Sequence, residues 1–227
     1  MIEEQFQKIC GCIKSACGAA GRNPDQVQLL AVTDRRTPEQ IQEAVTCGIT
    51  IFGESRIYEA KQKIPICPGQ LSWHFLGHLQ MSKVPDAIAL FEMIHSVNSL
   101  ELLKALDKDA EVQGTTISVC LEINVAQASE KFGLAPESIP EIFKVARNLK
   151  KVDIIGFSTQ PPVSREPEQE RHWFRELAQL RDKWREETGF PLPELAMGTD
   201  HDFVIAIEEG ATLIKLGRLL FEKFGAL

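Results

Sequence analysis

Short apolar runs and longer segments of helical periodicity alternate along the whole chain. Residues 27–33 (VQLLAVT) form a nearly continuous apolar run, which is typical of a strand that is buried on both faces. Thr37 and Pro38 follow as an N-cap residue and a proline suited to the first helical position, and Gly48 ends the segment. This stretch therefore predicts one strand followed by one helix, and the same unit recurs toward the C-terminus.

Eight such strand–helix units can be read from the sequence. We expect strands at residues 27–33, 49–52, 71–76, 93–97, 116–125, 152–157, 194–197 and 212–216. The helices that follow them are expected at residues 37–48, 54–63, 83–90, 99–112, 136–149, 167–187, 202–209 and 219–224. An additional helix at residues 2–20 precedes the first strand. Eight units in this order predict an α/β protein with a single (β/α)8 TIM barrel, and an open doubly wound sheet is the alternative.

The chain is expected to form one domain overall. Residues 1–26 hold the N-terminal helix and a linker, and residues 27–227 hold the barrel. The proline-containing segment 160–170 is expected to be a surface loop after the sixth strand. The length of 227 residues, with 44% hydrophobic and 25% charged residues, is ordinary for a globular domain.

Charge and cysteine content narrow the classes of partner. The formal net charge of −7 argues against nucleic acid or an anionic membrane as partner. A small anion remains a possible ligand, because a local basic cluster is enough to bind one. No apolar run approaches the ~18 residues of a membrane span, and the N-terminus lacks the apolar core of a signal peptide. The six cysteines are thinly spread and form no zinc-binding set, which indicates reduced thiols. We therefore expect a cytoplasmic protein.

In a barrel of this class, the functional residues lie where the strands end and the following loops begin. This rule selects residues 33–36, 53–56, 74–83, 95–96, 124–133, 158–159, 198–202 and 217–218.

At these segments the sequence resembles a known family. The matching pieces are LLAVT (29–33), FGE (52–54), WHFLGHLQ (73–80) with Lys83, IHSV (94–97), NV (124–125), SEKFG (129–133), MG (197–198), and residues 202–212. In this order and at this spacing the chain, from residue 29 to residue 221, resembles the pyridoxal 5'-phosphate (PLP) homeostasis proteins, which are single-domain relatives of the N-terminal barrel of alanine racemase. The resemblance implies a PLP site at the barrel mouth, no catalytic turnover, and a monomer.

The resemblance also implies how PLP is held. In the family, a lysine just after the first strand forms a Schiff base with the PLP aldehyde. A serine after strand seven, an arginine in strand eight and the Gly-Ser/Thr pair after it hold the phosphate. Backbone N–H groups at a helix N-terminus suit a dianion, and a cation adds charge-assisted hydrogen bonds.

This sequence departs from the family at those positions. Asp34 stands at the lysine position, Ser55 replaces an asparagine, Asp200 stands at the phosphate-serine position, Lys215 replaces the arginine, and Arg218 follows Gly217 in place of Ser or Thr. Because a carboxylate cannot condense with an aldehyde, no imine is expected at Asp34.

Asp200 is expected at, or just before, the cap of the helix that carries Phe203. There a carboxylate can accept free backbone N–H groups. We hypothesise that Asp200 replaces the phosphate of the ligand and pairs with Lys215 or Arg218. The alternative is an ordinary N-cap aspartate with no bearing on ligands.

Asp34 has two interpretations as well. It pairs with Lys215 or Arg218, or it is a solvated loop charge. Noncovalent PLP binding, with Arg218 or Lys215 on the phosphate, remains open. A relocated imine at Lys83 or Lys131 is disfavoured, because lysines on such loops are usually solvated.

The histidines at strand ends are interpreted first as packed, hydrogen-bonded rings. His74 and His95 lie at or near the ends of the third and fourth strands. A metal set made from them with His201 and the nearby aspartates is not expected, because residues adjacent in sequence direct their side chains apart.

The residues expected to line the cofactor site are Asp34, Ser55, His74, Ser158, Asp200, Lys215, Gly217 and Arg218, with no catalytic residue and no metal. The sequence thus predicts a PLP homeostasis protein that binds PLP noncovalently, weakly or not at all. One alternative is a cofactor-free regulatory or anion-binding barrel module. A PLP-dependent racemase or decarboxylase is disfavoured, because the imine lysine is absent and no C-terminal β-domain is present to supply an opposing base.

Overall fold

The strands form a closed parallel barrel, as the sequence predicts. The structure is a computed structural model, and it describes residues 1–222. Each strand pairs with the next one in the chain, and the last strand pairs with the first. The strands are β1 (Gln28–Val32), β2 (Ile51–Glu54), β3 (Ser72–Phe75), β4 (Met93–Val97), β5 (Ile117–Glu122), β6 (Val152–Ser158), β7 (Glu194–Ala196) and β8 (Leu213–Leu216).

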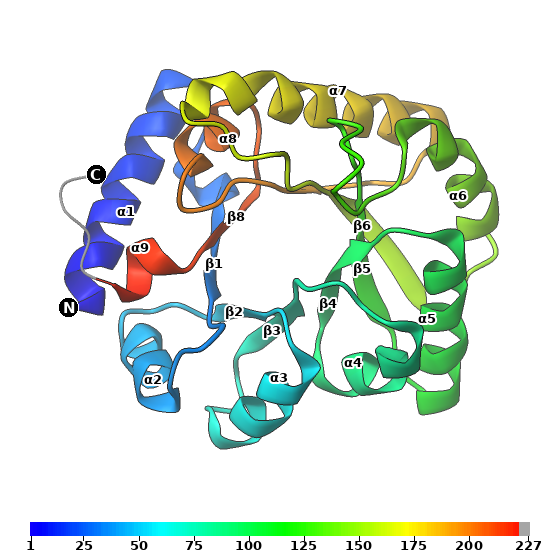
Figure 1. The fold of residues 1–227 in the computed structure, drawn as a ribbon, viewed down its shortest axis with the longest axis horizontal. Helices are drawn as coiled ribbons and strands as arrows, with labels where there is room; N and C mark the ends of the chain where they lie inside the picture. Colours follow the sequence, from blue (N-terminus) through cyan, green and yellow to red (C-terminus); the bar gives the residue numbers. More distant parts are fainter. Residues whose placement is uncertain (223–227) are drawn as a thin grey trace.

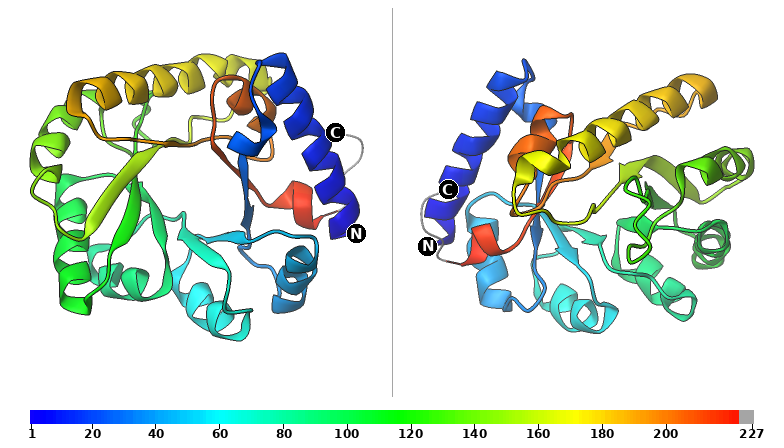
Figure 2. Two further views of the ribbon diagram at one scale, coloured as in Figure 1. Left: turned by 180° about the vertical axis from the view of Figure 1, so that it is seen from behind. Right: turned by 45° about the horizontal axis from the view of Figure 1, so that its top comes forward.

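Helices surround the barrel (Figures 1 and 2). They are α1 (Ile2–Ala19), α2 (Pro38–Thr46), α3 (Ile57–Lys63), α4 (Val84–Leu90), α5 (Leu100–Gln113), α6 (Ile139–Ala146), α7 (Arg171–Thr188), α8 (Phe203–Glu208) and α9 (Arg218–Phe221). The helix α1 packs against α8 and α9 on the outside, beside β1 and β8 (Figure 1). This additional helix covers the side where the barrel closes.

Short 3₁₀ turns shift several of the expected boundaries. Pro136–Ser138 and Pro167–Glu170 form 3₁₀ turns ahead of α6 and α7, so the α-helices begin later than the prolines suggest. The second strand continues through Glu54, which the sequence assigns to a helix, because Glu54 is held inside the structure. The predicted helix 219–224 appears as α9, which ends at Phe221, and residues 223–224 of the prediction lie outside the described residues.

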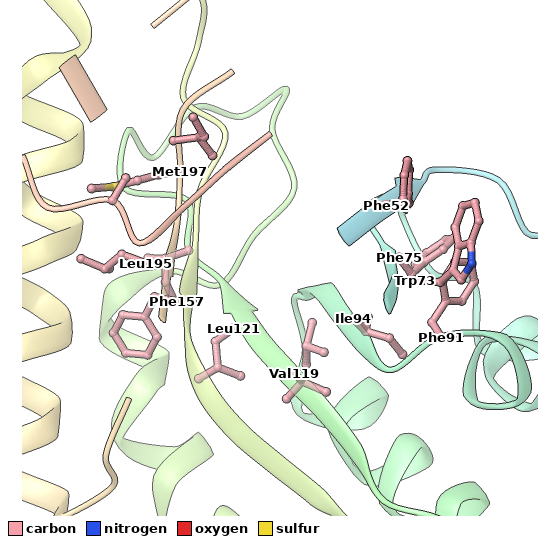
Figure 3. Close-up of a cluster of buried hydrophobic side chains, with 14 of the residues drawn as sticks. Phe52, Trp73, Phe75, Phe91, Ile94, Val119, Leu121, Phe157, Leu195 and Met197 are labelled. Atoms are coloured by element: carbon pink, nitrogen blue, oxygen red, sulfur yellow. The ribbon is translucent and has the colours of Figure 1, made fainter. Parts of the chain in front are cut away.

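Side chains of alternating direction build two apolar layers. Toward the helices, Phe52 packs on Trp73 with ring centroids 5.5 Å apart, and Phe75 packs on Phe91 at 5.2 Å (Figure 3). Inside the barrel a second cluster is formed by Leu30, Met93, Cys120, Ala196 and Leu213. Burying each large apolar side chain contributes about 1.5–3 kcal/mol, so these layers hold the strand ends in fixed positions.

Among residues 1–222, no helix has the length and apolar character needed to cross a membrane.

Candidate ligand-binding site at the barrel mouth

A cavity of about 550 Å³ opens at the carboxyl ends of the strands. It is lined by all of the predicted site residues except His74: Asp34, Ser55, Ser158, Asp200, Lys215, Gly217 and Arg218. The topology therefore brings these residues to one place, where barrel proteins hold their ligands. The ionisable side chains around the cavity include both bases and acids, namely Arg35, Arg36, Arg56, Lys215 and Arg218 and the acids Asp34, Glu122, Asp200 and Glu222.

The Asp200 carboxylate binds the free backbone N–H groups at the N-terminus of α9. Its two oxygens accept the backbone N–H groups of Gly217 at 3.0 Å, Arg218 at 2.9 Å and Leu219 at 3.1 Å. The exposed Arg218 guanidinium lies beside it, with Nε 3.9 Å from Asp200 Oδ2. A carboxylate on three backbone donors is the arrangement that a helix N-terminus offers to an anion.

Asp200 lies just before the cap of the helix that carries Phe203, as expected, and the N-cap residue itself is Asp202, whose Oδ1 accepts the Thr199 N–H at 2.5 Å. Its donors correct the sequence prediction, because within residues 1–222 the Asp200 carboxylate accepts N–H groups of α9 and none of α8. Asp200 instead reaches across to the strand-eight loop. Of its two expected cations, Arg218 lies beside it and Lys215 forms no ion pair with it in the described chain.

Gly198 lets the loop that carries Asp200 pass close to α8. Its φ is +94°, and a Cβ at this position would lie 2.7 Å from the Ala206 Cβ and 3.0 Å from the Phe203 Cα. A residue with a side chain would be strained here and would push the loop away. The glycine therefore helps to place Asp200 over α9.

Asp34 is held by Ser55, which corrects the expected pairing with Lys215 or Arg218. One carboxylate oxygen accepts the Ser55 N–H at 2.8 Å, and the other accepts the Ser55 hydroxyl at 2.7 Å. A tight turn orients Asp34, since Arg36 N–H donates to the Thr33 carbonyl at 2.9 Å and Arg35 adopts a left-handed φ of 62°. Asp34 is therefore neither a solvated loop charge nor an ion-pair partner of strand eight.

A buried ion pair lies directly beneath this turn. Lys63 Nζ donates to Glu54 Oε1 at 2.9 Å and to the Thr33 carbonyl at 2.8 Å, and the Thr33 hydroxyl donates to Glu54 at 2.5 Å. Glu54 is fully buried, and burial raises its pKa against the opposing effects of Thr33 and Lys63. Lys63 also bonds Glu59, whose pKa falls to about 2 because it accepts the Arg35 N–H, a hydrogen bond from Arg56 and one from Lys63.

The two strand-end histidines form one hydrogen-bonded chain inside the barrel. His74 Nδ1 lies 3.0 Å from His95 Nε2, and His74 Nε2 lies 3.1 Å from the Ser72 hydroxyl. That hydroxyl donates to Glu92 at 2.6 Å, so His74 must donate from Nε2 and accept at Nδ1. Burial lowers the pKa of His74 to about 4 and that of His95 well below its usual value. The packed interpretation is therefore confirmed for His74, which lies behind His95 and away from the cavity lining.

Ser158 and Lys215 complete the lining. The Ser158 hydroxyl is buried and donates to the His95 carbonyl, so it ties β6 to β4. Lys215 directs its amine toward the barrel interior, with a hydrogen bond to the Ala196 carbonyl at 3.3 Å. No group of three potential metal ligands occurs among residues 1–222.

Sequence reasoning missed Glu122 and Lys63, and it selected Glu54 only as part of the strand-end segment 53–56, without a role. Glu122 ends β5 and lines the cavity, but the expected strand runs on to residue 125, so the strand-end rule selects residues 124–133 instead. The Glu54–Lys63 pair could not be found from spacing alone, because the strand ends at Glu54 and the helix that carries Lys63 begins three residues later than expected.

Comparison with known proteins places the chain in a family. Residues 37–222 match the family described as alanine racemase, N-terminal domain. A pyridoxal phosphate homeostasis protein from Aquifex aeolicus is 36% identical over 219 residues, which cover 96% of this chain and 96% of that relative. The chain belongs to the pyridoxal phosphate homeostasis protein family.

Solved structures of this family share the fold. PipY of Synechococcus elongatus without PLP is 29% identical and has a TM-score of 0.88, covering 97% of this chain and all of PipY. The structure of PipY with PLP bound has a TM-score of 0.85 at the same identity and coverage. The resemblance and the barrel expected from the sequence are thus confirmed.

Proposed function

We propose that this member of the pyridoxal phosphate homeostasis family acts without catalytic turnover and binds PLP noncovalently, weakly or not at all. The observation that carries the proposal is the contact of the Asp200 carboxylate with the backbone N–H groups of Gly217, Arg218 and Leu219. In the family pattern, the Gly-Ser/Thr pair at residues 217–218 holds the ligand phosphate. An internal anion therefore competes for the same donors.

The residues of the cavity do not fit PLP at either of its two anchors. At the phosphate anchor, a dianion would meet the Asp200 carboxylate, and repulsion between like charges would add to the loss of three hydrogen bonds. At the aldehyde anchor, Asp34 supplies no amine and is engaged by Ser55. Both differences weaken the binding of PLP.

The mixed charge of the mouth supports the same conclusion. A phosphate site is usually lined by cations and by free backbone donors. Here Arg36 is paired with Glu222 at 2.5 Å, and Arg218 is exposed beside Asp200. We further propose that the protein is a cytoplasmic monomer that binds no nucleic acid, in keeping with its net charge of −7.

The test is a titration of the purified protein with PLP, followed by absorbance, with inorganic phosphate as competitor. We expect no saturable binding in the micromolar range and no effect of phosphate. Micromolar binding that phosphate displaces would overturn the proposal, because it would require free donors at α9.

A further inference from the structure

Among residues 1–222, Lys215 is the one buried amine of the cavity lining that the proposed function leaves unused. It lies in β8, opposite Leu30 of β1, and its side chain belongs to the inner face of the barrel. In the described part of the chain, its amine has a single hydrogen bond, to the Ala196 carbonyl at 3.3 Å, and no ion pair. Desolvation lowers the pKa of Lys215, so this amine loses its proton more readily than the amine of a surface lysine does. The neutral amine is the nucleophilic form.

Two further groups with unused hydrogen-bonding capacity face the same cavity. His95 Nδ1 is buried and has no hydrogen-bond partner within residues 1–222. The chain Glu92–Ser72–His74–His95 makes His95 donate from Nε2, which leaves Nδ1 as an unprotonated acceptor.

Glu122 is the second of these groups. Its carboxyl lines the cavity, and no described residue hydrogen-bonds it. Burial raises the pKa of Glu122, which favours the protonated acid, while the charge of Lys215 opposes this effect. Lys215, His95 and Glu122 therefore place an amine, a hydrogen-bond acceptor and an acid around one space of about 550 Å³.

We propose that Lys215 is a carbonyl-binding residue, which forms an imine with a small aldehyde that carries no phosphate group. The amine nitrogen attacks the carbonyl carbon, a C–N bond forms, and one N–H proton moves to the oxygen to give a carbinolamine. The Glu122 acid then protonates the hydroxyl, the C–O bond breaks and water leaves. The remaining N–H proton returns to Glu122, which leaves a C=N bond and a restored acid.

The exclusion of phosphorylated aldehydes rests on the proposed function. Asp200 occupies the donors that a phosphate would need, and Asp34 adds a second carboxylate at the mouth. A neutral aldehyde of similar size meets neither obstacle. The amine itself depends on neither aspartate, so the two proposals can fail separately.

The experiment compares pyridoxal with PLP, which differ only in the phosphate. The full chain is incubated with each aldehyde, reduced with borohydride so that any imine becomes a stable amine, and mapped by peptide mass spectrometry. With pyridoxal we expect roughly tenfold more label at Lys215 than at the exposed Lys104, because desolvation keeps more of the buried amine neutral. With PLP we expect no excess at Lys215.

Matched variants separate chemistry from folding. Lys215→Met should abolish the excess label with unchanged circular dichroism, and Lys104→Met should leave the label at Lys215 intact. Glu122→Gln should slow the labelling of Lys215 in the folded protein, which gives a readout if Lys215→Met does not fold.

Three outcomes are decisive. Pyridoxal label spread evenly over exposed lysines would overturn the carbonyl-binding role of Lys215. A labelling rate unaffected by Glu122→Gln would overturn the proton-transfer step assigned to Glu122. Equal labelling of Lys215 by PLP and pyridoxal would support the amine and overturn phosphate exclusion by Asp200.

Discussion

Asp200 Oδ1 accepts the backbone N–H of Gly217 at 3.0 Å, although the two residues lie on different loops of the barrel mouth. The same carboxylate also accepts the next two N–H groups, so it stabilises the first turn of α9. We expect Asp200→Asn to lower the free energy of unfolding by about 1 kcal/mol, because an amide offers one acceptor oxygen and no charge. Urea denaturation measures this loss. The exposed Asp153→Asn is the matched control and should change stability little.

Restoring the family lysine alone should not restore a covalent PLP site. In Asp34→Lys the amine is present, but Asp200 still occupies the backbone N–H groups that would bind the PLP phosphate. We therefore expect little visible imine absorbance on addition of PLP. The double variant Asp34→Lys/Asp200→Ser should show that absorbance at a lower PLP concentration. A strong band in the single variant would show that phosphate binding survives in the presence of Asp200.

Removing one partner of the buried ion pair Glu54–Lys63 should strongly lower the free energy of unfolding. Lys63→Met leaves Glu54 fully buried without its cation, and we expect a loss of about 3–5 kcal/mol in unfolding free energy. Lys63→Met combined with Glu54→Gln should lose less than the sum of the single changes. A double-mutant cycle by chemical denaturation measures the coupling, and additive losses would contradict it.

Stability should fall as the pH drops from 6.5 toward 4. The pKa of His74 is about 4 in the folded protein and near 6.5 when unfolded, so the unfolded chain binds more protons in this window. The stabilisation is complete above pH 6.5 and is lost as the pH falls, by on the order of 3 kcal/mol. His95 shifts in the same direction.

Matched variants isolate this contribution. His74→Gln should flatten the dependence of the urea midpoint on pH, whereas the exposed His172→Gln should leave it unchanged. An unaltered pH dependence in His74→Gln would contradict the assignment.

The periodicity of apolar residues was sufficient to predict the fold, because each strand–helix unit repeats the same local pattern. The run at 27–33 and the capped helix after Thr37 appear as β1 and α2, with the capping box formed by Thr37 and Gln40. The strand-end rule then assembled most of the candidate site, since parallel strands end at the same rim.

The contacts within the site could not be predicted, because they depend on loop paths. Asp200 precedes α8 in sequence, yet its loop turns at Gly198 and delivers the carboxylate to α9. Asp34 was expected to meet a cation, but the turn at Arg35 directs it to Ser55, one strand away. Proximity along the chain favoured the wrong helix for Asp200, and the expectation of an opposite charge favoured the wrong partner for Asp34.

The most direct test of the central claim is the affinity for PLP of Asp200→Ser against that of the unaltered protein, measured by equilibrium titration. Removing the carboxylate frees three backbone N–H groups and supplies a hydroxyl. The account predicts that Asp200→Ser binds PLP at least about tenfold more tightly, a gain of about 1.4 kcal/mol, and that inorganic phosphate competes. Equal affinities for the two proteins, or tighter binding by the unaltered protein, would contradict the claim that Asp200 takes the place of the ligand phosphate.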